Sequence, residues 1–343
     1  MTHTWKTAVI GSGNVAQTKH SEAYGELADR IAPVAVCDPS AESRNAFGDM
    51  YGIPNERRVA TLEELEPFRD DIELAVIATP VKFHRPSVEF AASQGWHILC
   101  EKPLALSVDE AEAMVKAAEA AEVRFGIVHN IYYMNTTGCC RAAIERGDIG
   151  EVRLVRCETY RGPWDADHWR RSQELGGHGH FFDCLYHEIY LTRRAVGRPI
   201  ESLYAQTAHN VYDPGKGEVE DTMLCVARFE GGAMASFQDA MCAPHGKSVF
   251  ETHGARGSIV RNIPVPEDRR WLYRDGEAHE APHDPRSTPH GCRSVFEDFL
   301  DALDRGEEPP YMVRAGGDGL DNLRVVLAAY RSAQEGKSVD VNI

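Results

Sequence analysis

The chain reads Gly11-Ser12-Gly13-Asn14-Val15-Ala16 between a short apolar run, Lys6 to Ile10, and a helical pattern from Asn14 to about Ala28. A GxGxxA turn between a strand and a helix is typical of dinucleotide binding. Gly11 permits the tight turn, and Gly13 lets the backbone approach a pyrophosphate. Asn14 and Val15 open the helix, whose N-terminus offers N–H groups to phosphate. These four residues are predicted to contact the cofactor.

Asp38 follows the next predicted strand, Pro33 to Cys37, and lies 22 residues beyond Ala16. An acidic residue at this distance bonds the adenosine ribose in such folds, and its charge favours NAD over NADP. Asp38 has a plainer alternative role, which is to begin the turn at Pro39 or to cap the helix after it. Arg44 lies further along that helix and would allow NADP. We therefore predict NAD as the cofactor, with NADP as the alternative.

Strands and helices alternate through the first third of the chain, which predicts a doubly wound parallel sheet of the Rossmann type. We assign residues 1–128 to this nucleotide-binding domain. Further strands are expected at 73–79, 97–100 and 123–128, and helices at 40–51, 86–94 and 110–122.

Two more segments carry a resemblance. Glu101-Lys102-Pro103 follows a predicted strand, and the second segment reads Gly176-Gly-His-Gly-His-Phe-Phe-Asp183-Cys-Leu-Tyr-His187. Together with the glycine-rich turn, they resemble the glucose–fructose oxidoreductase and inositol dehydrogenase family, called Gfo/Idh/MocA. Thr79-Pro80 with His84 and His129-Asn130 fit the same pattern, so the resemblance covers nearly the whole chain.

The resemblance implies an α/β fold with a second domain, residues 129–343, built on a large, open-faced, mostly antiparallel sheet. A helix at about 318–335 is expected to pack back on the Rossmann domain. The open sheet face is expected to form a homodimer or homotetramer. The family pattern assigns catalysis to Lys102, Asp183 and His187, and adds Thr79, Pro80, His84, Glu101 and Lys102 to the cofactor contacts.

Oxidation of an alcohol carbon requires a base for the hydroxyl proton, and His187 has a suitable ordinary pKa of about 6.5. Asp183 precedes it by four residues in a predicted helix, 180–196, so both lie on one face. Asp183 would orient the imidazole or bind a neighbouring hydroxyl. Lys102 would stabilise the alkoxide or exchange the proton itself. The alternative is that the Asp–His pair is a structural contact.

The loop at 161–171 is rich in indole and charge. Trp164 and Trp169 are candidates for stacking on a sugar ring, and His168 and Arg170 for bonding its hydroxyls; ordinary packing is the alternative. Asn130 and Tyr132 are further substrate candidates. His178 is expected to shape the site or cap a helix. Many relatives have glycine at positions 178 and 185, where this chain has His178 and Leu185, which leaves the substrate open.

The histidines of this region suggest a metal site, since His168, His178, His180 and His187 accompany Asp183. Their spacing matches no known zinc arrangement, and hydride transfer needs no metal. We predict none.

The composition restricts partners and compartment. The chain has 343 residues and a net charge of −16, so nucleic acid and anionic membranes are not expected to bind. No secretion leader is expected at the N-terminus. Nine scattered cysteines without CxxC spacing indicate free thiols and a cytoplasmic location. In the second domain we expect strands at 152–160, 202–210, 222–229, 233–240 and 248–253, a surface excursion at 268–289, and helices at 295–303 and 320–333.

The predicted function is an NAD(P)-dependent oxidoreductase that transfers hydride to or from a hydroxyl-bearing carbon of a sugar, cyclitol or sugar derivative. One alternative is a redox-neutral epimerase or glycoside-cleaving enzyme with tightly held NAD. The other is a non-catalytic sugar or dinucleotide sensor on the same fold.

Overall fold

The computed structural model describes residues 3–243, 246–263, 269–281, 284–310 and 314–341. Contacts divide the chain into two compact units. The first joins Met1–Tyr133 to His290–Leu320, and the second joins Met134–Pro289 to Asp321–Ile343. The expected division at residue 128 is therefore incomplete, because a late segment of the chain returns to the first unit.

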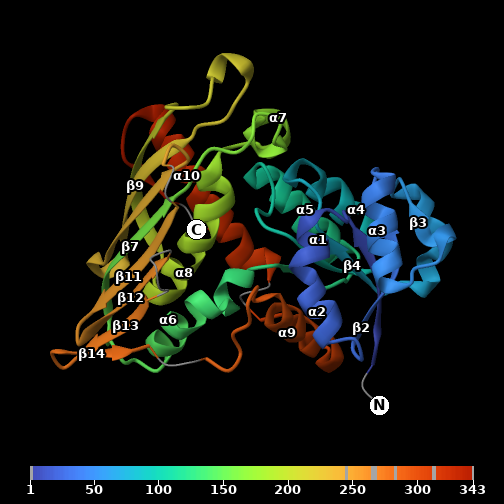
Figure 1. Cartoon of the computed structure of the whole chain (residues 1–343), viewed down its shortest axis with the longest axis horizontal. Coiled ribbons are helices and arrows are strands. Elements are labelled where there is room, and N and C mark those ends of the chain that lie inside the picture. The colour runs from blue at the N-terminus through green and yellow to red at the C-terminus, as the bar shows by residue number, and fades with distance from the viewer. Residues whose placement is uncertain (1–2, 244–245, 264–268, 282–283, 311–313, 342–343) are drawn as a thin grey trace. The chain divides into compact units, whose positions relative to one another are not determined.

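The first unit holds a six-stranded parallel sheet in the order β3-β2-β1-β4-β5-β6 (Figure 1). Its strands are β1 (Trp5–Ile10), β2 (Ile31–Cys37), β3 (Arg58–Val59), β4 (Leu74–Ile77), β5 (His97–Cys100) and β6 (Phe125–Ile127). The order reverses next to β1, and ligands of such sheets bind at the carboxyl ends of the strands beside this switch point. The doubly wound Rossmann sheet predicted from the sequence is confirmed.

The helices of this unit follow local signals. They are α1 (Asn14–Thr18), α2 (His20–Glu26), α3 (Ala41–Tyr51), α4 (His84–Ser93), α5 (Val108–Ala120) and α9 (Cys292–Arg305). The single helix expected from Asn14 to Ala28 is interrupted at Lys19. Ser40 and Ser107 cap α3 and α5, because each side chain accepts a first-turn N–H.

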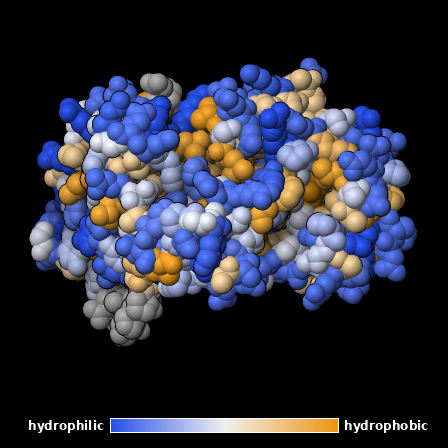
Figure 2. All heavy atoms as spheres, turned by 90° about the horizontal axis from the view of Figure 1, so that it is seen from above, coloured by the Kyte–Doolittle hydropathy of each residue, from blue (hydrophilic) through white to orange (hydrophobic). Residues whose placement is uncertain are grey.

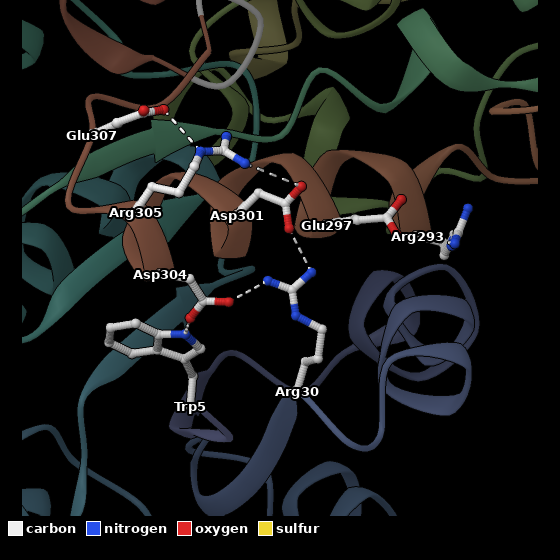
Figure 3. Close-up of polar contacts among 8 residues, drawn as sticks. All are labelled: Trp5, Arg30, Arg293, Glu297, Asp301, Asp304, Arg305 and Glu307. Atoms are coloured by element: carbon white, nitrogen blue, oxygen red, sulfur yellow. Dashed lines mark hydrogen bonds and ion pairs between the residues drawn. The ribbon is translucent and has the colours of Figure 1, made fainter. Parts of the chain in front are cut away.

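Helix α9 is the late segment that returns to the first unit. Arg30 donates to Asp301 and to Asp304, each at 2.6 Å, and Trp5 Nε1 donates to Asp304 at 2.9 Å (Figure 3). At the other end of the helix, the Glu22 carboxylate accepts the N–H groups of Cys292 and Arg293.

The helix expected at about 318–335 is α10 (Leu320–Glu335), which belongs to the second unit, and its packing on the Rossmann domain stays a prediction. Within the second unit, Asn322 donates to the Tyr186 carbonyl at 2.9 Å, and Ser332 Oγ accepts the Ala205 N–H at 3.0 Å. These contacts place the helix beside the sheet and helices of its own unit.

The second unit holds a nine-stranded sheet in the order β14-β13-β12-β11-β7-β10-β9-β8-β15. All neighbours are antiparallel except β7 and β10. The strands are β7 (Val152–Tyr160), β8 (Ile200–Ala208), β9 (Thr222–Phe229), β10 (Met234–Ala240), β11 (Lys247–Gly254), β12 (Gly257–Ile263), β13 (Arg269–Arg274), β14 (Glu277–Glu280) and β15 (Val339–Asp340). The large, mostly antiparallel sheet predicted from the sequence is confirmed.

The expected surface excursion at 268–289 was wrong for β13 and β14, while residues 268 and 282–283 lie outside the described residues. Charged side chains hid the strand pattern, as is common at sheet edges. Asp275-Gly276 was the available signal, since both residues have positive φ and this pair favours a tight hairpin turn.

One face of the large sheet carries helices α6 (Asn135–Glu145), α8 (Tyr186–Val196) and α10, which lie along the same side in Figure 1. The other face is open. Its exposed apolar side chains include Leu154, Leu224, Val226 and Met234. Elsewhere hydrophilic side chains dominate the surface, as Figure 2 shows for one view. Within the described residues, no helix is both long and apolar enough to cross a membrane.

Candidate active site

The glycine-rich turn follows β1 and has the geometry that nucleotide binding requires. Gly11 has φ +86°, and a Cβ there would lie 2.7 Å from the backbone of Ala78 and Thr79. A side chain is therefore excluded by both conformation and space. Gly13 begins α1, and a Cβ there would meet nothing within 4 Å. The space in front of Gly13 is open to a phosphate group.

Asp38 holds the same turn from the end of β2. Its carboxylate accepts the Ser12 N–H and the Ser40 N–H, each at 2.8 Å. The plainer of its two predicted roles, at the turn before α3, is thus present. A carboxylate has further lone pairs, so a ribose contact remains compatible with these bonds. Arg44 donates to the Asp38 carbonyl at 3.3 Å, so carboxylate and guanidinium lie at one strand end.

The strand ends also present two hydroxyl groups. Ser12 Oγ and Thr79 Oγ1 are buried and have no hydrogen-bond partner among the described residues. Buried polar groups are nearly always hydrogen-bonded, so two orphaned hydroxyls point to a polar ligand. Together with the open space at Gly13, they fit the dinucleotide that the turn predicts.

The buried His84 side chain lies beneath the loops that follow β4 and β5. Its Nε2 lies 3.0 Å from the Thr79 carbonyl, and its Nδ1 lies 3.1 Å from the Leu104 carbonyl. Burial lowers the pKa of His84. Pro80 precedes the short helix between Thr79 and His84. Because both ring nitrogens face backbone carbonyls, His84 ties the loop after β4 to the loop after β5. Its contact with the cofactor stays a prediction.

Glu101 and Lys102 follow β5. The Glu101 carboxylate accepts a hydrogen bond from His20 Nε2 at 2.8 Å and the Lys102 N–H at 3.1 Å. Burial opposes its charge, but His20 and Lys102 hold the pKa of Glu101 below its usual range. Glu101 therefore fixes the backbone that carries Lys102. Sequence reasoning missed His20, because nothing in the chain marks a partner 81 residues away.

Asn130 and Tyr132 lie in a short helix, Asn130–Tyr133, at the end of the first Rossmann segment. Both are buried. Asn130 Nδ2 donates to the His290 carbonyl at 2.8 Å, and the Tyr132 ring packs edge-on against Tyr133. Asn130 thus holds the returning chain, and the contact of both side chains with substrate stays a prediction.

In the second unit, Asp183 lies in a π-helical turn, Phe181–Leu185, and His187 lies in α8 directly after it. The regular helix expected from residue 180 was wrong in its first turn. The wider turn changes the angle between the two side chains, so simple i,i+4 spacing does not describe them. Single π turns inside helices are frequent at functional sites.

Asp183 pairs with a row of stacked side chains. Its Oδ2 lies 3.2 Å from Arg170 Nε, and the Arg170 guanidinium lies 4.3 Å from the Trp169 ring centroid. Trp169 stacks on His168 at 6.1 Å, and His168 on Trp164 at 5.3 Å. Four predicted substrate residues thus form one row that ends at Asp183.

A second loop holds this row in place. Trp164 N–H donates to the Tyr212 hydroxyl at 2.8 Å, and Arg171 donates to Glu218 at 2.7 Å. Asp221 Oδ2 accepts three consecutive N–H groups, from residues 210, 211 and 212, and so shapes the loop that carries Tyr212. Trp164 is therefore packed in place by this loop, and its contact with substrate stays a prediction.

The two histidines before Asp183 have protein partners. His178 stacks on Tyr330 at 4.0 Å, and burial lowers the pKa of His178 to about 4. His180 Nδ1 lies 2.6 Å from Asp239 Oδ1. Burial opposes the charge on this ring, but Cys184 and Asp239 hold the pKa of His180 well above its usual range. Among the described residues, no group of three or more His, Cys, Asp or Glu side chains is arranged to hold a metal ion.

Comparison with known proteins agrees with this geometry. Residues 5–129 match the profile of an oxidoreductase family with an NAD-binding Rossmann fold, and residues 139–260 match the GFO/IDH/MocA C-terminal domain. The chain is 32% identical to levoglucosan dehydrogenase of Pseudarthrobacter phenanthrenivorans, covering 96% of this chain and 90% of that protein. The chain belongs to the Gfo/Idh/MocA oxidoreductase family.

Two further relatives are dehydrogenases. The chain is 27% identical to inositol 2-dehydrogenase of Rhizobium meliloti, covering 98% of this chain and 99% of that protein. The WlbA dehydrogenase from Bordetella pertussis, solved with NADH and UDP-GlcNAcA, superposes with a TM-score of 0.83 at 25% identity, covering 100% and 99% of the two chains. This chain is accordingly an NAD-dependent oxidoreductase with an NAD-binding Rossmann domain.

Proposed function

We propose that this oxidoreductase acts on a CH–OH group of a sugar, cyclitol or sugar derivative, with Lys102, Asp183 and His187 as catalytic residues. The observation that carries the proposal is the row from Trp164 to Arg170, which ends on Asp183. Aromatic faces and polar edges suit a ring with many hydroxyls. Relatives named for levoglucosan and inositol fit this substrate class.

Each residue has a role that follows from its surroundings. NAD, when bound, accepts the hydride, and the protein must receive the hydroxyl proton. His187 is proposed as the base for that proton. Arg170 keeps Asp183 oriented, and the carboxylate binds a neighbouring hydroxyl or aligns the base. Lys102, whose backbone is fixed by Glu101, stabilises the negative charge that develops on the substrate oxygen.

The cofactor preference is proposed to be NAD. Asp38 lies at the end of β2, where its charge disfavours a 2′-phosphate. Arg44 beside it would allow weaker use of NADP. We propose cofactor contacts from the turn residues Gly11, Gly13, Asn14 and Val15, together with Asp38, Thr79 and Pro80.

The open sheet face is proposed to bind a second copy of the chain. Leu154, Leu224, Val226 and Met234 are each about half exposed there. A contiguous apolar patch of this kind marks an interface more often than a free surface. We also propose a cytoplasmic location, since all nine cysteines are free thiols.

The first experiment measures reduced-nicotinamide absorbance with NAD or NADP across a panel of inositols, aldoses and glycosides. We expect substrate-dependent signal with NAD that is lost in Lys102→Ala and His187→Ala. Lys116→Ala, which removes an exposed lysine of α5, is the control and should keep activity. No signal across the panel, with stoichiometric dinucleotide released on unfolding, would favour the redox-neutral enzyme. Absence of any dinucleotide binding would overturn the proposal.

A further inference from the structure

A buried carboxylate lies beneath the segment that carries Asp183. Glu220 directly precedes Asp221 and β9, and it is 8% exposed. The Gly179 N–H donates to both of its carboxylate oxygens, at 3.0 and 3.1 Å. The Tyr330 hydroxyl of α10 donates to the same carboxylate at 2.6 Å. Glu220 is thus a shared acceptor for two separate parts of the unit.

Tyr330 also links the Glu220 carboxylate to Phe182, the residue next to Asp183. The Phe182 N–H donates to the Tyr330 hydroxyl oxygen at 3.1 Å. The Gly179 N–H therefore bonds the Glu220 carboxylate directly, and the Phe182 N–H is linked to it through Tyr330. The approach is close, because a Cβ at Gly179 would lie 2.1 Å from the Glu220 carbonyl oxygen.

The groups that face Glu220 determine when it is charged. Burial raises the pKa of Glu220 to about 7, although the hydrogen bonds from Tyr330 and Gly179 oppose the shift. Asp239 on β10 adds to the rise and is itself paired with His180. His178 stacks on the other side of Tyr330.

Protonation would change the bonds that Glu220 makes. An ionised carboxylate only accepts hydrogen bonds, and both Tyr330 and Gly179 offer it donors. A protonated carboxyl must donate one bond, so one of the present contacts would be lost or reversed. The segment before Asp183 would then lose part of its support.

We propose that Glu220 is a positioning residue, which in its ionised form fixes the segment 179–182 through Gly179 and Tyr330 and so sets the position of Asp183. The proposal rests on the catalytic role assigned to Asp183 above. It implies that activity rises with pH through a step near pH 7 that belongs to Glu220. A displacement of a reacting group by about 1 Å lowers turnover by about 100-fold, which gives the scale of the effect.

The test measures kcat and KM from pH 5.5 to 9 for the wild type, Glu220→Gln and Tyr330→Phe. Glutamine copies the protonated carboxyl, so Glu220→Gln should lower kcat by about 10- to 100-fold above pH 7 and leave only the pH dependence of the base His187, with little change in KM. Tyr330→Phe removes a bond that favours the charged form, so its step should move to higher pH. Glu145→Gln, at a side chain of α6 that is 47% exposed, is the control and should keep the wild-type profile.

A second readout does not depend on activity. Hydrogen–deuterium exchange of the peptide 177–187 at pH 8 should be faster in Glu220→Gln and Tyr330→Phe than in the wild type and Glu145→Gln. Equal exchange in all four proteins, or a kcat of Glu220→Gln above pH 7 that equals the wild-type value, would overturn the proposal. If Asp183→Asn keeps full activity while exchange responds as expected, the assignment of Asp183 fails and the anchoring by Glu220 stands.

Discussion

The two units position their candidate residues in different ways. In the first unit, the nucleotide turn depends on groups close in the chain: Gly11, where a side chain does not fit, and the Asp38 carboxylate, which accepts the Ser12 N–H. In the second unit, the segment before Asp183 is held by ionisable side chains from distant strands and helices. Gly179 and Glu220 are 41 residues apart, and Phe182 and Tyr330 are 148 apart.

This difference has a physical consequence. A turn fixed by the positive φ of Gly11 should be intolerant of added atoms. A segment held by buried carboxylates and histidines should respond to pH, because charge decides which hydrogen bonds it makes. Variants in the first unit should therefore lose NAD binding, and variants in the second unit should lose turnover.

The largest expected effect separates chemistry from cofactor binding. Asp183→Asn should lower kcat by about 100- to 10,000-fold, since it removes a charged group proposed to act on the substrate. The dissociation constant for NAD, measured by fluorescence titration, should change by less than about twofold, because the turn of the first unit is untouched. A large loss of NAD affinity would contradict this separation.

Gly11→Ala tests the opposite loss, that of NAD binding through a change in the first unit. A Cβ at this positive φ collides with the backbone of Ala78 and Thr79, so we expect a loss of about 2–4 kcal/mol in unfolding free energy together with loss of NAD binding. Gly25→Ala is the matched control. Gly25 lies in α2, where a Cβ meets nothing within 4 Å, and alanine there should be neutral or stabilising by up to about 1 kcal/mol. Urea denaturation of both variants measures the difference.

The same contrast explains what could be predicted from the sequence. The turn at Gly11, Asp38 and the alternation of strands and helices could be predicted, because each depends on neighbours close in the chain. Asp183 and His187 were found only through a family pattern. The π turn between them was not predicted, because it depends on contacts of Gly179 and Phe182 with groups far along the chain.

Two predicted cofactor residues have protein contacts that the sequence does not indicate. His84 lies against two carbonyls and Glu101 accepts from His20, while their contact with the cofactor stays a prediction. Helix α9 was assigned to the wrong domain, because amphipathic spacing shows that a helix packs and does not show on which sheet. Contacts between distant segments, such as Arg30 with Asp304 and Glu22 with Cys292, decide it.

A smaller effect tests the pH response of the second unit. Burial lowers the pKa of His178 to about 4, whereas an unfolded histidine titrates near about 6.5. The unfolded chain therefore binds more protons between these values, and stability falls as pH decreases from about 6.5 to 4. His178→Phe keeps an aromatic ring against Tyr330 and removes this loss, so wild type should weaken relative to the variant by about 2–3 kcal/mol over that range. Parallel stability curves for the two proteins would show that His178 does not titrate in this way.

The smallest effect concerns the attachment of α9. Arg30→Ala removes two ion pairs to Asp301 and Asp304 from a side chain that is 14% exposed (Figure 3). We expect about 1–2 kcal/mol of destabilisation, more than a surface pair contributes, because the guanidinium is largely enclosed and Asp304 keeps only Trp5. Arg305→Ala, at a 53% exposed position of the same helix, should cost less than about 0.5 kcal/mol. Hydrogen–deuterium exchange should localise the effect of Arg30→Ala to α9 and β1 and leave the peptide 177–187 unchanged. Faster exchange in that peptide would mean that the support of Asp183 depends on the first unit, and the contrast between the two units would then fail.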